Sequence, residues 1–415
     1  MEYIKGFSDK KYGLLGEHLA HSFSPQIHNA FADYPYTLCE VEKENLGAWI
    51  KTNDLAGYNV TIPYKQAVMP YLQEISPCAK SIGAVNTVVR CKDGTLFGDN
   101  TDYYGFAYML KKLGVDVKGK KAVILGGGGA SKTVQAVLKE SGAQVVVVDL
   151  GLENNYDNIH LHFDAEIIVN ATPVGMYPKT GVSLVNLENF KNCCGVCDVI
   201  YNPANTALLL QAQNLGIPSV NGLSMLVAQA KRAAEIFTDN DLCDCVIEKI
   251  RGQVEAQTMN IVLVGMPGCG KSTVGRIVAK TLARPFADCD EEITNRTGST
   301  PSEIIKTQGE ARFRKTETQV LESLCKESGW VIATGGGAVT IKENFDILRQ
   351  NAVVVFIERA IELLSTEDRP LSVNLPELYQ KRLPMYQSFA HVSVDGNAPA
   401  EVVADRVLKV FSEVL

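Results

Sequence analysis

The sequence lacks several features that would set it apart from ordinary globular proteins. No apolar run approaches the ~18 residues of a membrane-spanning helix, and the first residues contain no apolar segment of the kind that secretory signals carry. Positive charge is not in excess either, because the net charge is −7, and only 21% of the 415 residues are charged. Hydrophobic residues make up 46%, which is typical of packed globular domains. We therefore expect a cytoplasmic protein that binds neither nucleic acid nor membranes.

Histidine is missing from the neighbourhood of the cysteine clusters, which argues against a zinc site. The 11 cysteines are an odd number and are spread along the whole chain. One cluster holds Cys193, Cys194 and Cys197. A further pair, Cys243 and Cys245, has a spacing that does not suit a zinc knuckle. With no export signal, this pattern predicts free thiols in a reducing compartment.

Two short apolar runs, each followed by glycines, divide the chain. Residues 121–125 precede Gly126–Gly129, and residues 260–264 precede Gly265–Ser272. A strand, a glycine loop and a helix-compatible segment in this order are typical of an open α/β sheet. The length of 415 residues, at roughly 150 residues per domain, predicts two to three domains. The polar stretch at 238–259 predicts a closing helix and a linker, with a boundary near Thr258.

The second glycine loop matches the phosphate-binding pattern G-x-x-x-x-G-K-[ST]. Its glycines let backbone N–H groups surround phosphate oxygens, and the following helix N-terminus adds positive potential. Lys271 would reach the outer phosphates of ATP, and Ser272 would ligate Mg²⁺. The residues predicted to bind the nucleotide are Gly268, Cys269, Gly270, Ser272 and Thr273. Because Cys269 lies beside Lys271 at a helix N-terminus, we expect it to react with thiol reagents more readily than Cys289.

Five ordered segments in the second half are similar to motifs of shikimate kinase. They are Phe286–Asp290, Gly309–Glu317, Thr334–Gly337, Asp368–Leu371 and Lys381–Tyr386. Residues 259–415 therefore resemble a shikimate kinase, and the resemblance implies a P-loop kinase domain with a parallel sheet.

This resemblance also implies roles for individual residues of the second half. Arg314, Gly336 and Arg382 would bind the substrate, with the two arginines on its carboxylate. The residues with implied catalytic roles are Lys271, Asp290, which orients the attacking hydroxyl, and Arg369 on the lid. Asp288 would hold Mg²⁺ through water.

The first glycine loop has the layout of a dinucleotide-binding site. Its residues follow a strand, and the next strand ends in Asp149, about twenty residues after the loop. The loop residues predicted to bind the cofactor are Gly126, Gly127, Gly128, Gly129 and Ala130. Seven segments around this loop are similar to motifs of shikimate dehydrogenase. They are His21–Asn29, Tyr58–Lys65, Gly83–Thr87, Gly98–Asp102, Asn170–Met176, Asp198–Pro203 and Met225–Ala230.

Residues 1 to about 252 thus resemble a shikimate dehydrogenase, which implies two domains. An α/β substrate domain would cover residues 1–103, completed by helices at 224–252, and a Rossmann-like dinucleotide domain would cover 104–223. A linker at 253–258 would lead to the kinase domain at 259–415. Both a monomer and a homodimer stay open.

The same resemblance implies a site in the first half. Lys65 would supply a proton to the reacting oxygen, and Asp102 would orient Lys65. The donors expected to bind the substrate are Ser22, Ser24 and Tyr201 at its carboxylate and Thr61, Asn86 and Gln229 at its hydroxyls. Val199 and Gly222 would complete the cofactor site. Asp99–Asp102 could also cap a helix that begins near Tyr103, and His21 and His28 are expected to be structural.

Asp149 bears on the choice between NAD and NADP. Where the family usually has basic residues that hold the 2′-phosphate of NADP, this chain has Leu150 and Asn154. The segment from there to Asn170 is also short for the usual helix. A carboxylate at a strand end suits a free ribose 2′-hydroxyl and repels a 2′-phosphate. The sequence therefore favours NAD, unless Lys132 in the next helix compensates.

Together, the two resemblances imply a bifunctional enzyme of chorismate and aromatic amino acid biosynthesis that acts on small molecules. Its first half would reversibly reduce 3-dehydroshikimate to shikimate with NAD(P)H. Its second half would phosphorylate shikimate to shikimate 3-phosphate with MgATP. Two alternatives stay open for the first half: a quinate/shikimate dehydrogenase of broad specificity, or a catalytically weak regulatory module.

Overall fold

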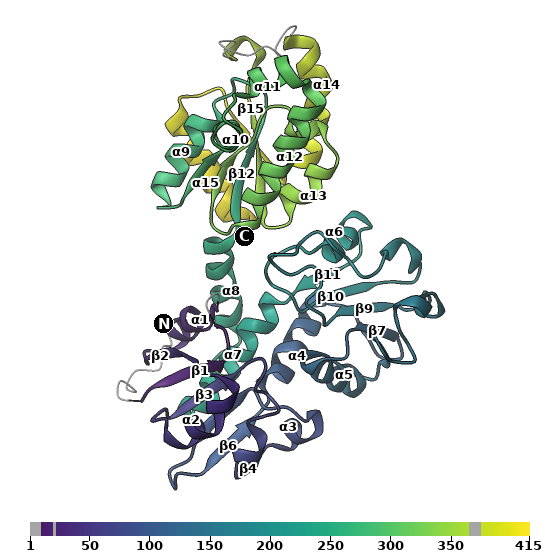
Figure 1. Cartoon of the computed structure of the whole chain (residues 1–415), viewed down its shortest axis with the longest axis vertical. Helices are drawn as coiled ribbons and strands as arrows, with labels where there is room; N and C mark the ends of the chain where they lie inside the picture. The colour runs from purple at the N-terminus through teal and green to yellow at the C-terminus, as the bar shows by residue number, and fades with distance from the viewer. Residues whose placement is uncertain (1–9, 20–21, 365–374) are drawn as a thin grey trace. The chain divides into compact units, whose positions relative to one another are not determined.

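The computed structural model describes residues 10–19, 22–364 and 375–415 (Figure 1). The chain forms two compact units, each α/β, as the sequence predicted. The first consists of Met1–Val174, Ser183–Tyr201 and Gln211–Gly252, and the second of Gly175–Val182, Asn202–Leu210 and Gln253–Leu415. Within the described ranges, no helix combines the length and hydropathy that a membrane span requires.

The first unit begins with a mixed sheet of six strands in the order β2-β1-β3-β5-β6-β4. Its strands are β1 (Tyr12–Gly16), β2 (Tyr36–Glu40), β3 (Gly57–Val60), β4 (Glu74–Ile75), β5 (Thr87–Arg90) and β6 (Leu96–Asp99). Strand β1 pairs in parallel with β2 and β3, whereas β5 is antiparallel to β3 and β6. The helical segments are α1 (Ser24–Phe31), η1 (Lys43–Asn45), α2 (Leu46–Thr52), η2 (Met69–Tyr71) and α3 (Pro77–Ile82).

The same unit continues with a parallel sheet of five strands in the order β11-β10-β9-β7-β8. Its strands are β7 (Lys121–Leu125), β8 (Gln144–Val148), β9 (Ile167–Asn170), β10 (Gly195–Asp198) and β11 (Ser219–Asn221). The helical segments around it are α4 (Thr101–Leu113), α5 (Gly129–Glu140), η3 (Tyr156–His162), η4 (Leu187–Asn189), α6 (Ala207–Asn214), α7 (Leu223–Thr238) and α8 (Cys245–Thr258). Strand order reverses at β7, which is where ligands bind in sheets of this kind. Between β8 and β9 there is only the 3₁₀ helix η3, which agrees with the short segment expected there.

The second unit holds another five-stranded parallel sheet, in the order β13-β14-β12-β15-β16. Its strands are β12 (Asn260–Val264), β13 (Phe286–Asp288), β14 (Val331–Ala333), β15 (Ala352–Glu358) and β16 (Val392–Asp395). The helical segments are α9 (Lys271–Thr281), α10 (Cys289–Thr297), α11 (Pro301–Gln308), α12 (Glu310–Lys326), η5 (Ala338–Thr340), α13 (Glu343–Arg349), η6 (Ile361–Leu363), α14 (Leu375–Phe389) and α15 (Ala400–Val414). Strand β12 is buried along its length, as an apolar run in a covered parallel sheet should be. Residues 253–258, expected as a linker, are the last part of α8.

Helix α7 joins the two parts of the first unit. A Cβ on Gly105 of α4 would lie 2.6 Å from the carbonyl oxygen of Met225 on α7, so the two helices pack at a distance that only glycine allows. At its other end, α7 meets the first sheet, where the Tyr12 hydroxyl donates to the carbonyl of Phe237 at 2.9 Å. The two parts are therefore fixed against a common helix.

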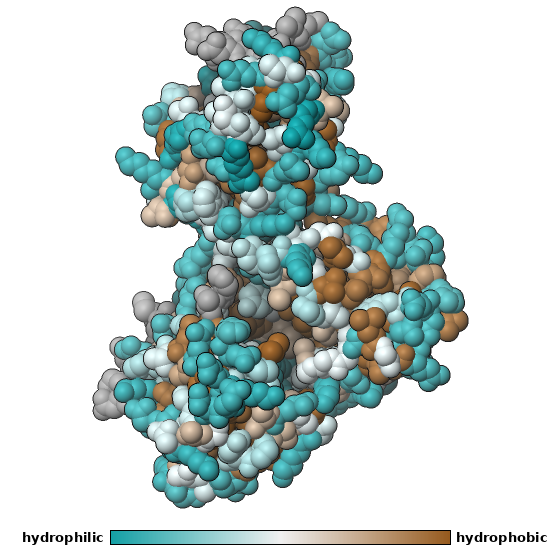
Figure 2. Space-filling model, in the orientation of Figure 1, coloured by the Kyte–Doolittle hydropathy of each residue, from teal (hydrophilic) through white to brown (hydrophobic). Residues whose placement is uncertain are grey.

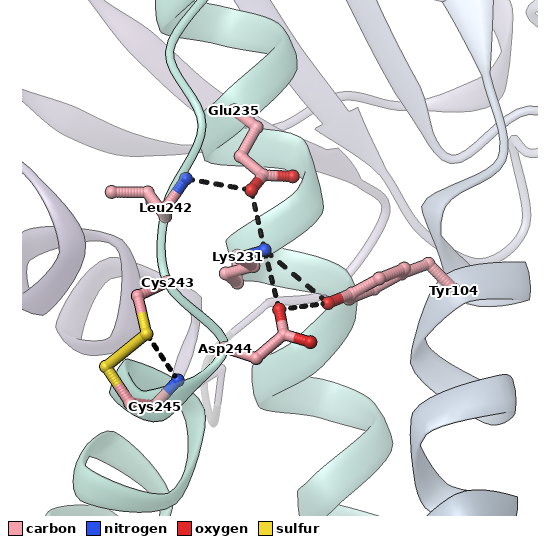
Figure 3. The surroundings of a disulfide bond; sticks show 7 residues. All are labelled: Tyr104, Lys231, Glu235, Leu242, Cys243, Asp244 and Cys245. Carbon is pink, nitrogen blue, oxygen red and sulfur yellow. Dashed lines mark hydrogen bonds and ion pairs between the residues drawn. A yellow bond between two sulfur atoms is a disulfide. The ribbon is translucent and has the colours of Figure 1, made fainter.

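Cys243 and Cys245 form a disulfide just before α8, so the expectation of free thiols is wrong for this pair (Figure 3). Their Cα atoms are 5.2 Å apart, a spacing that suits a disulfide, because the chain turns tightly between them. The other nine cysteines are free, as expected.

The residue between these cysteines, Asp244, belongs to a polar network that ties three segments together (Figure 3). Its carboxylate accepts from the buried Lys231 of α7 at 2.8 Å and from the hydroxyl of Tyr104 on α4 at 2.6 Å. Lys231 also pairs with the buried Glu235 at 2.6 Å. Burial opposes the charge of Lys231, but its hydrogen bonds with Asp244 and Glu235 outweigh that effect and raise its pKa.

Replacing Lys231 should destabilise the first unit. In Lys231→Met, Glu235 keeps only Arg232 as a cation and Asp244 loses its hydrogen bond from Lys231, so we expect the free energy of unfolding to fall by about 2–3 kcal/mol. Urea unfolding followed by Trp49 fluorescence, in a Trp330→Phe background, isolates the first unit because the chain has only 2 tryptophans. The control is Lys112→Met, which breaks the exposed pair with Glu248 and should change the value by less than about 1 kcal/mol. Equal unfolding curves for the two variants would contradict this role of Lys231.

Candidate active sites

Lys65 and Asp102 form a direct ion pair in the first unit. The Lys65 Nζ donates to the Asp102 Oδ2 at 2.6 Å, and the two side chains are 24% and 11% exposed. Asp102 lies in the first turn of α4, where the N-cap is Asn100 and makes no side-chain capping bond. The Asp102 carboxylate therefore serves Lys65 rather than the helix end. Figure 2 shows the surface hollowed between the parts of this unit that carry its two sheets.

Amide and hydroxyl side chains lie next to this pair. The Oδ1 of the buried Asn86 accepts from the backbone N–H of Thr101 at 2.7 Å. The Thr101 hydroxyl reaches the Gln229 Oε1 at 3.4 Å, and Gln229 donates in turn to the carbonyl of Leu226 at 2.8 Å. The structure thus brings Asn86 and Gln229 together through Thr101. We did not single out Thr101 from the sequence, although it adjoins Asp102 in the quoted motif.

Two of the residues predicted to donate hydrogen bonds to the substrate carboxylate, Ser22 and Ser24, lie near the start of α1. The backbone N–H of Ser24 donates to the Ser22 Oγ at 3.2 Å, so these two serines lie together. The Tyr201 ring lies 5.8 Å from that of the intervening Phe23, and burial raises the pKa of Tyr201. Thr61 follows β3, and its N–H donates to the carbonyl of Leu15 at 2.9 Å.

His28 is structural, as expected. It is buried, it stacks on Tyr36 at 4.1 Å between ring centroids, and its Nδ1 hydrogen-bonds the Tyr34 hydroxyl at 2.7 Å. Burial lowers the pKa of His28 to about 3, so the ring stays neutral. His21 lies outside the described residues.

The first glycine loop connects β7 to α5. Gly126 has a φ of +101°, and a Cβ there would lie 2.6 Å from the Thr172 Cγ2. The backbone N–H of Gly127 donates to the Asp149 Oδ2 at 2.8 Å, and that of Leu150 donates to the Oδ1 at 2.8 Å. Asp149 is therefore fixed against the loop. Gly128 is the N-cap of α5, and Gly129 and Ala130 are its first residues.

Val199 and Gly222 lie at the same edge of this sheet. The N–H of Gly222 donates to the carbonyl of Ile200 at 2.9 Å, and a Cβ on Gly222 would lie 2.0 Å from the Val199 carbonyl oxygen. This contact leaves no room for a side chain. The ends of β7, β10 and β11 meet at one edge because the strands are parallel, so these residues and the glycine loop can face one cofactor.

The second glycine loop connects β12 to α9. Gly265, Gly268 and Gly270 have φ values of +152°, +84° and +96°, which favour glycine. The Nζ of the buried Lys271 donates to the carbonyls of Gly265 and Met266 at 2.9 and 3.0 Å, so the ammonium group lies across the loop. Such an arrangement suits nucleotide phosphates.

Cys269 does not have the accessibility that the sequence led us to expect. It is only 1% exposed, and its Sγ lies 3.9 Å from the Lys271 Nζ. A thiol reagent needs an accessible thiolate, so the structure contradicts high reactivity at this site. Cys289 is buried too, and burial raises its pKa, in line with the low reactivity expected of it.

Ser272 and Asp288 present oxygen atoms beside the loop. The Ser272 Oγ donates to the Asp288 Oδ2 at 2.5 Å, and the Asp288 Oδ1 accepts from the N–H of Asp290 at 3.0 Å as the N-cap of α10. A hydroxyl and a carboxylate are ligand types that suit Mg²⁺, which keeps most of its water and takes few protein ligands. The two residues therefore fit the metal role predicted for them. Thr273 follows in α9 and is exposed.

Two arginines lie around the glycines at 335–337. The buried Arg314 of α12 donates to the Glu317 Oε2 at 2.7 Å, and a Cβ on Gly337 would lie 2.2 Å from its Nη2. The buried Arg382 of α14 donates to the Gly336 carbonyl at 3.1 Å. Gly335 lies between two acids, because a Cβ there would be 2.2 Å from the Glu317 Oε1 and 3.3 Å from the Asp290 Oδ1. The structure thus gathers Arg314, Arg382, Gly336 and Asp290, while Arg369 lies outside the described residues.

Glu317 is a site residue that the sequence reasoning did not select. It is fully buried, and its Oε1 has no hydrogen-bond partner within the described part of the chain. Burial raises the pKa of Glu317, the charge of Asp290 adds to the effect, and Arg314 opposes it. The sequence did contain a signal for Glu317, because this residue ends the motif Gly309–Glu317.

Comparison with known proteins assigns families to both units. A sequence model of the shikimate dehydrogenase substrate binding domain matches residues 14–88, and a model of shikimate kinase matches residues 267–412. The shikimate dehydrogenase (NADP(+)) of Clostridium beijerinckii is 42% identical over 252 residues, which are 56% of this chain and 93% of that protein.

Solved structures match a share of the chain similar to that matched by the Clostridium beijerinckii protein. A chorismate mutase/shikimate 5-dehydrogenase fusion protein from Clostridium acetobutylicum is 39% identical with a TM-score of 0.57, covering 60% of this chain and 98% of that one. The shikimate 5-dehydrogenase of Listeria monocytogenes, in complex with shikimate and NAD, is 31% identical with a TM-score of 0.53. That match covers 60% of this chain and 98% of the other.

The close contact between Gly222 and Val199 predicts that a single methyl group added at position 222 weakens dinucleotide binding. Gly222→Ala forces the Val199 backbone to move, at a cost of about 1–3 kcal/mol. We expect dinucleotide affinity, measured by NADPH and NADH fluorescence, to fall about tenfold. Gly252→Ala is the control, because a Cβ there meets no atom within 4 Å. Unchanged affinity in the folded Gly222→Ala variant would refute this placement of Gly222.

Proposed function

Since the chain belongs to the shikimate dehydrogenase family and carries a shikimate kinase domain in its second unit, we propose that its two units catalyse consecutive reactions of chorismate biosynthesis. It is a bifunctional enzyme of the shikimate pathway. In our proposal, the first unit reduces 3-dehydroshikimate to shikimate, and the second phosphorylates the 3-hydroxyl of shikimate. The observation that supports the proposal is that each unit holds groups of the kind its reaction needs. These are the Lys65–Asp102 ion pair in one unit, and Lys271 of the phosphate loop and Asp290 in the first turn of α10 in the other.

In the first unit, the substrate ketone would lie against Lys65. A bound nicotinamide supplies the hydride. The Lys65 Nζ stabilises the negative charge that develops on the ketone oxygen and donates a proton to it. Asp102, at 2.6 Å, orients the Lys65 side chain. This hydrogen-bonded pair argues for an active dehydrogenase rather than a weak regulatory module.

Neutral donors would hold the substrate of the first unit. Ser22, Ser24 and Tyr201 would bind its carboxylate, and their hydroxyls suffice where the site is partly enclosed. The substrate hydroxyls would bind Thr61, Asn86 and Gln229. Because the Asn86 Oδ1 already accepts from Thr101, we infer that Asn86 offers its amide N–H groups to the substrate.

In the second unit, Arg314 and Arg382 would bind the shikimate carboxylate as charged, planar donors. Asp290 would orient the 3-hydroxyl for attack and accept its proton. Lys271 would neutralise charge on the phosphates, and we assign a similar role to Arg369. Ser272 and Asp288 would hold Mg²⁺, which adds positive charge at the phosphates when bound.

The choice of nicotinamide cofactor depends on Asp149. Its carboxylate, held by Gly127 and Leu150, would accept from a free ribose 2′-hydroxyl. A 2′-phosphate there would be repelled by about 1 to 4 kcal/mol, depending on solvent exposure. Leu150, which is 80% exposed, cannot compensate as a cation. We therefore propose that NAD(H) serves at least as well as NADP(H), although the relative from Clostridium beijerinckii is named for NADP(+). The NAD-bound structure of the Listeria relative supports this proposal.

The two activities should be separable. Lys65→Ala should abolish oxidoreduction and leave phosphorylation nearly intact, and Lys271→Ala should do the reverse, because the two sets of residues belong to different units. The measurement follows NAD(P)H absorbance with 3-dehydroshikimate and ATP consumption with shikimate, on one preparation of each variant. A folded single variant that loses both activities would show that the sites are not independent.

The proposal for the nicotinamide cofactor predicts at most a small preference for NADPH over NADH. We expect kcat/KM for NADPH to be no more than about tenfold above that for NADH. Asp149→Asn should shift the ratio towards NADPH, because the like-charge contact is removed. Glu153→Gln, an exposed acid in the same loop, is the control and should leave the ratio unchanged. A strong preference for NADPH in the unmodified enzyme would rule out the role given to Asp149.

A further inference from the structure

Arg359 is a cation in the second unit that none of the assigned roles uses. It follows directly after β15, the strand next to β12, and β12 leads into the phosphate-binding loop. The side chain is partly buried, and its Nε has no hydrogen-bond partner among the described residues and no exposure to water. A buried N–H group without a partner is unfavourable, and this shielded Nε can gain a partner only if the side chain shifts towards an anion beside it.

The guanidinium group of Arg359 lies against the loop itself. A Cβ built on Gly270 would lie 3.6 Å from the Arg359 Nη1. Gly270 is the last glycine of the loop and the N-cap of α9, where backbone N–H groups point towards a bound anion. Arg359 therefore places its charge at the edge of the phosphate cradle, on the side away from β13 and β14.

The backbone around Arg359 is held firmly. The N–H of Ala360 donates to the Asn397 Oδ1 at 2.8 Å, and the N–H of Gly396 donates to the Glu358 carbonyl at 2.6 Å. A Cβ on Gly396 would lie 3.4 Å from the Arg359 Cβ, so the loop after β16 packs directly on this residue. The position of the cation is thus set by two neighbouring strands.

The acids nearby are engaged elsewhere. Glu358 accepts from the Tyr379 hydroxyl at 3.4 Å, Asp395 pairs with Arg406 at 2.7 Å, and Asp288 accepts from Ser272. Within the described ranges, Arg359 forms no ion pair. Its charge is therefore available to an anion that enters the loop.

Building on the kinase function proposed above, we propose that Arg359 binds the nucleotide by donating to a phosphate oxygen of ATP at the Gly270 edge of the loop. Arginine suits this task because it is always charged and presents several donors in a fixed plane. Lys271 reaches the phosphates from within the loop, and Arg359 reaches them from β15. The two cations would hold the phosphate chain from different elements.

The test compares nucleotide binding in three variants of the full chain by titration calorimetry with ATP, ADP and adenosine. Arg359→Met should weaken ATP and ADP binding by about tenfold to a hundredfold and leave adenosine binding unchanged. Arg359→Lys keeps the charge but not the Nε donor. Its affinities for ATP and ADP should lie between those of the unmodified chain and those of Arg359→Met. Arg276→Met is the matched control, because Arg276 lies on α9 but pairs with Glu291, and it should bind ATP normally.

Two further measurements make the result decisive: the folding of the kinase unit and the phosphorylation of shikimate. Trp330 fluorescence in a Trp49→Phe background shows whether the kinase unit of each variant is folded. Arg359→Lys decides the test if Arg359→Met does not fold. Unchanged ATP affinity in a folded Arg359 variant would overturn the proposal, and so would an equal loss for adenosine, which would assign Arg359 to the base. If the unmodified chain binds ATP but does not phosphorylate shikimate, the proposed kinase function fails, whereas the role of Arg359 in phosphate binding still stands on the calorimetry.

Discussion

Both candidate sites depend on glycines whose neighbours lie so close that no other side chain would fit there. In the first unit, Gly105 lets α4 and α7 touch, which brings Asp102 and Gln229 to one site. Gly222 presses on the Val199 carbonyl at the cofactor edge in the same way. In the second unit, Gly337 lies where a Cβ would overlap the Arg314 guanidinium. The predicted functional groups thus reach their positions because glycine, which has no Cβ, allows the neighbouring segments to pack closely.

Two of these glycines, Gly222 and Gly337, lie in segments that follow strands of parallel sheets, whereas Gly105 lies within α4. In a parallel sheet, all carboxyl ends lie at one edge, so loops that are distant in sequence meet there. The loops after β7, β8, β10 and β11 do so in the first unit, and those after β12, β13, β14 and β15 in the second. In each parallel sheet, the predicted site residues at these strand ends therefore come from several loops that are distant in sequence.

The sequence predicted what depends on local pattern. The α/β fold and both families followed from glycine loops after short apolar strands and from ordered motifs, and the Lys65–Asp102 pair formed as the motifs implied. What the sequence could not give depends on packing. The burial of Cys269 arises from neighbours on other strands and helices. So does the lack, among the described residues, of a partner for the Glu317 Oε1 and the Arg359 Nε. The Cys243–Cys245 disulfide was missed because overall cysteine statistics say nothing about a tight local turn.

The bond between Tyr12 and Phe237 sets the order of events during synthesis. These residues are 225 positions apart, and β1, the second strand from one edge of the first sheet, contacts the end of α7. The ribosome makes roughly 5–20 residues per second, so β1 waits about 10 to 45 seconds for that partner. During this time Tyr12 lacks Phe237, on which its ring stacks in the folded unit, so the nascent chain exposes apolar surface that favours aggregation.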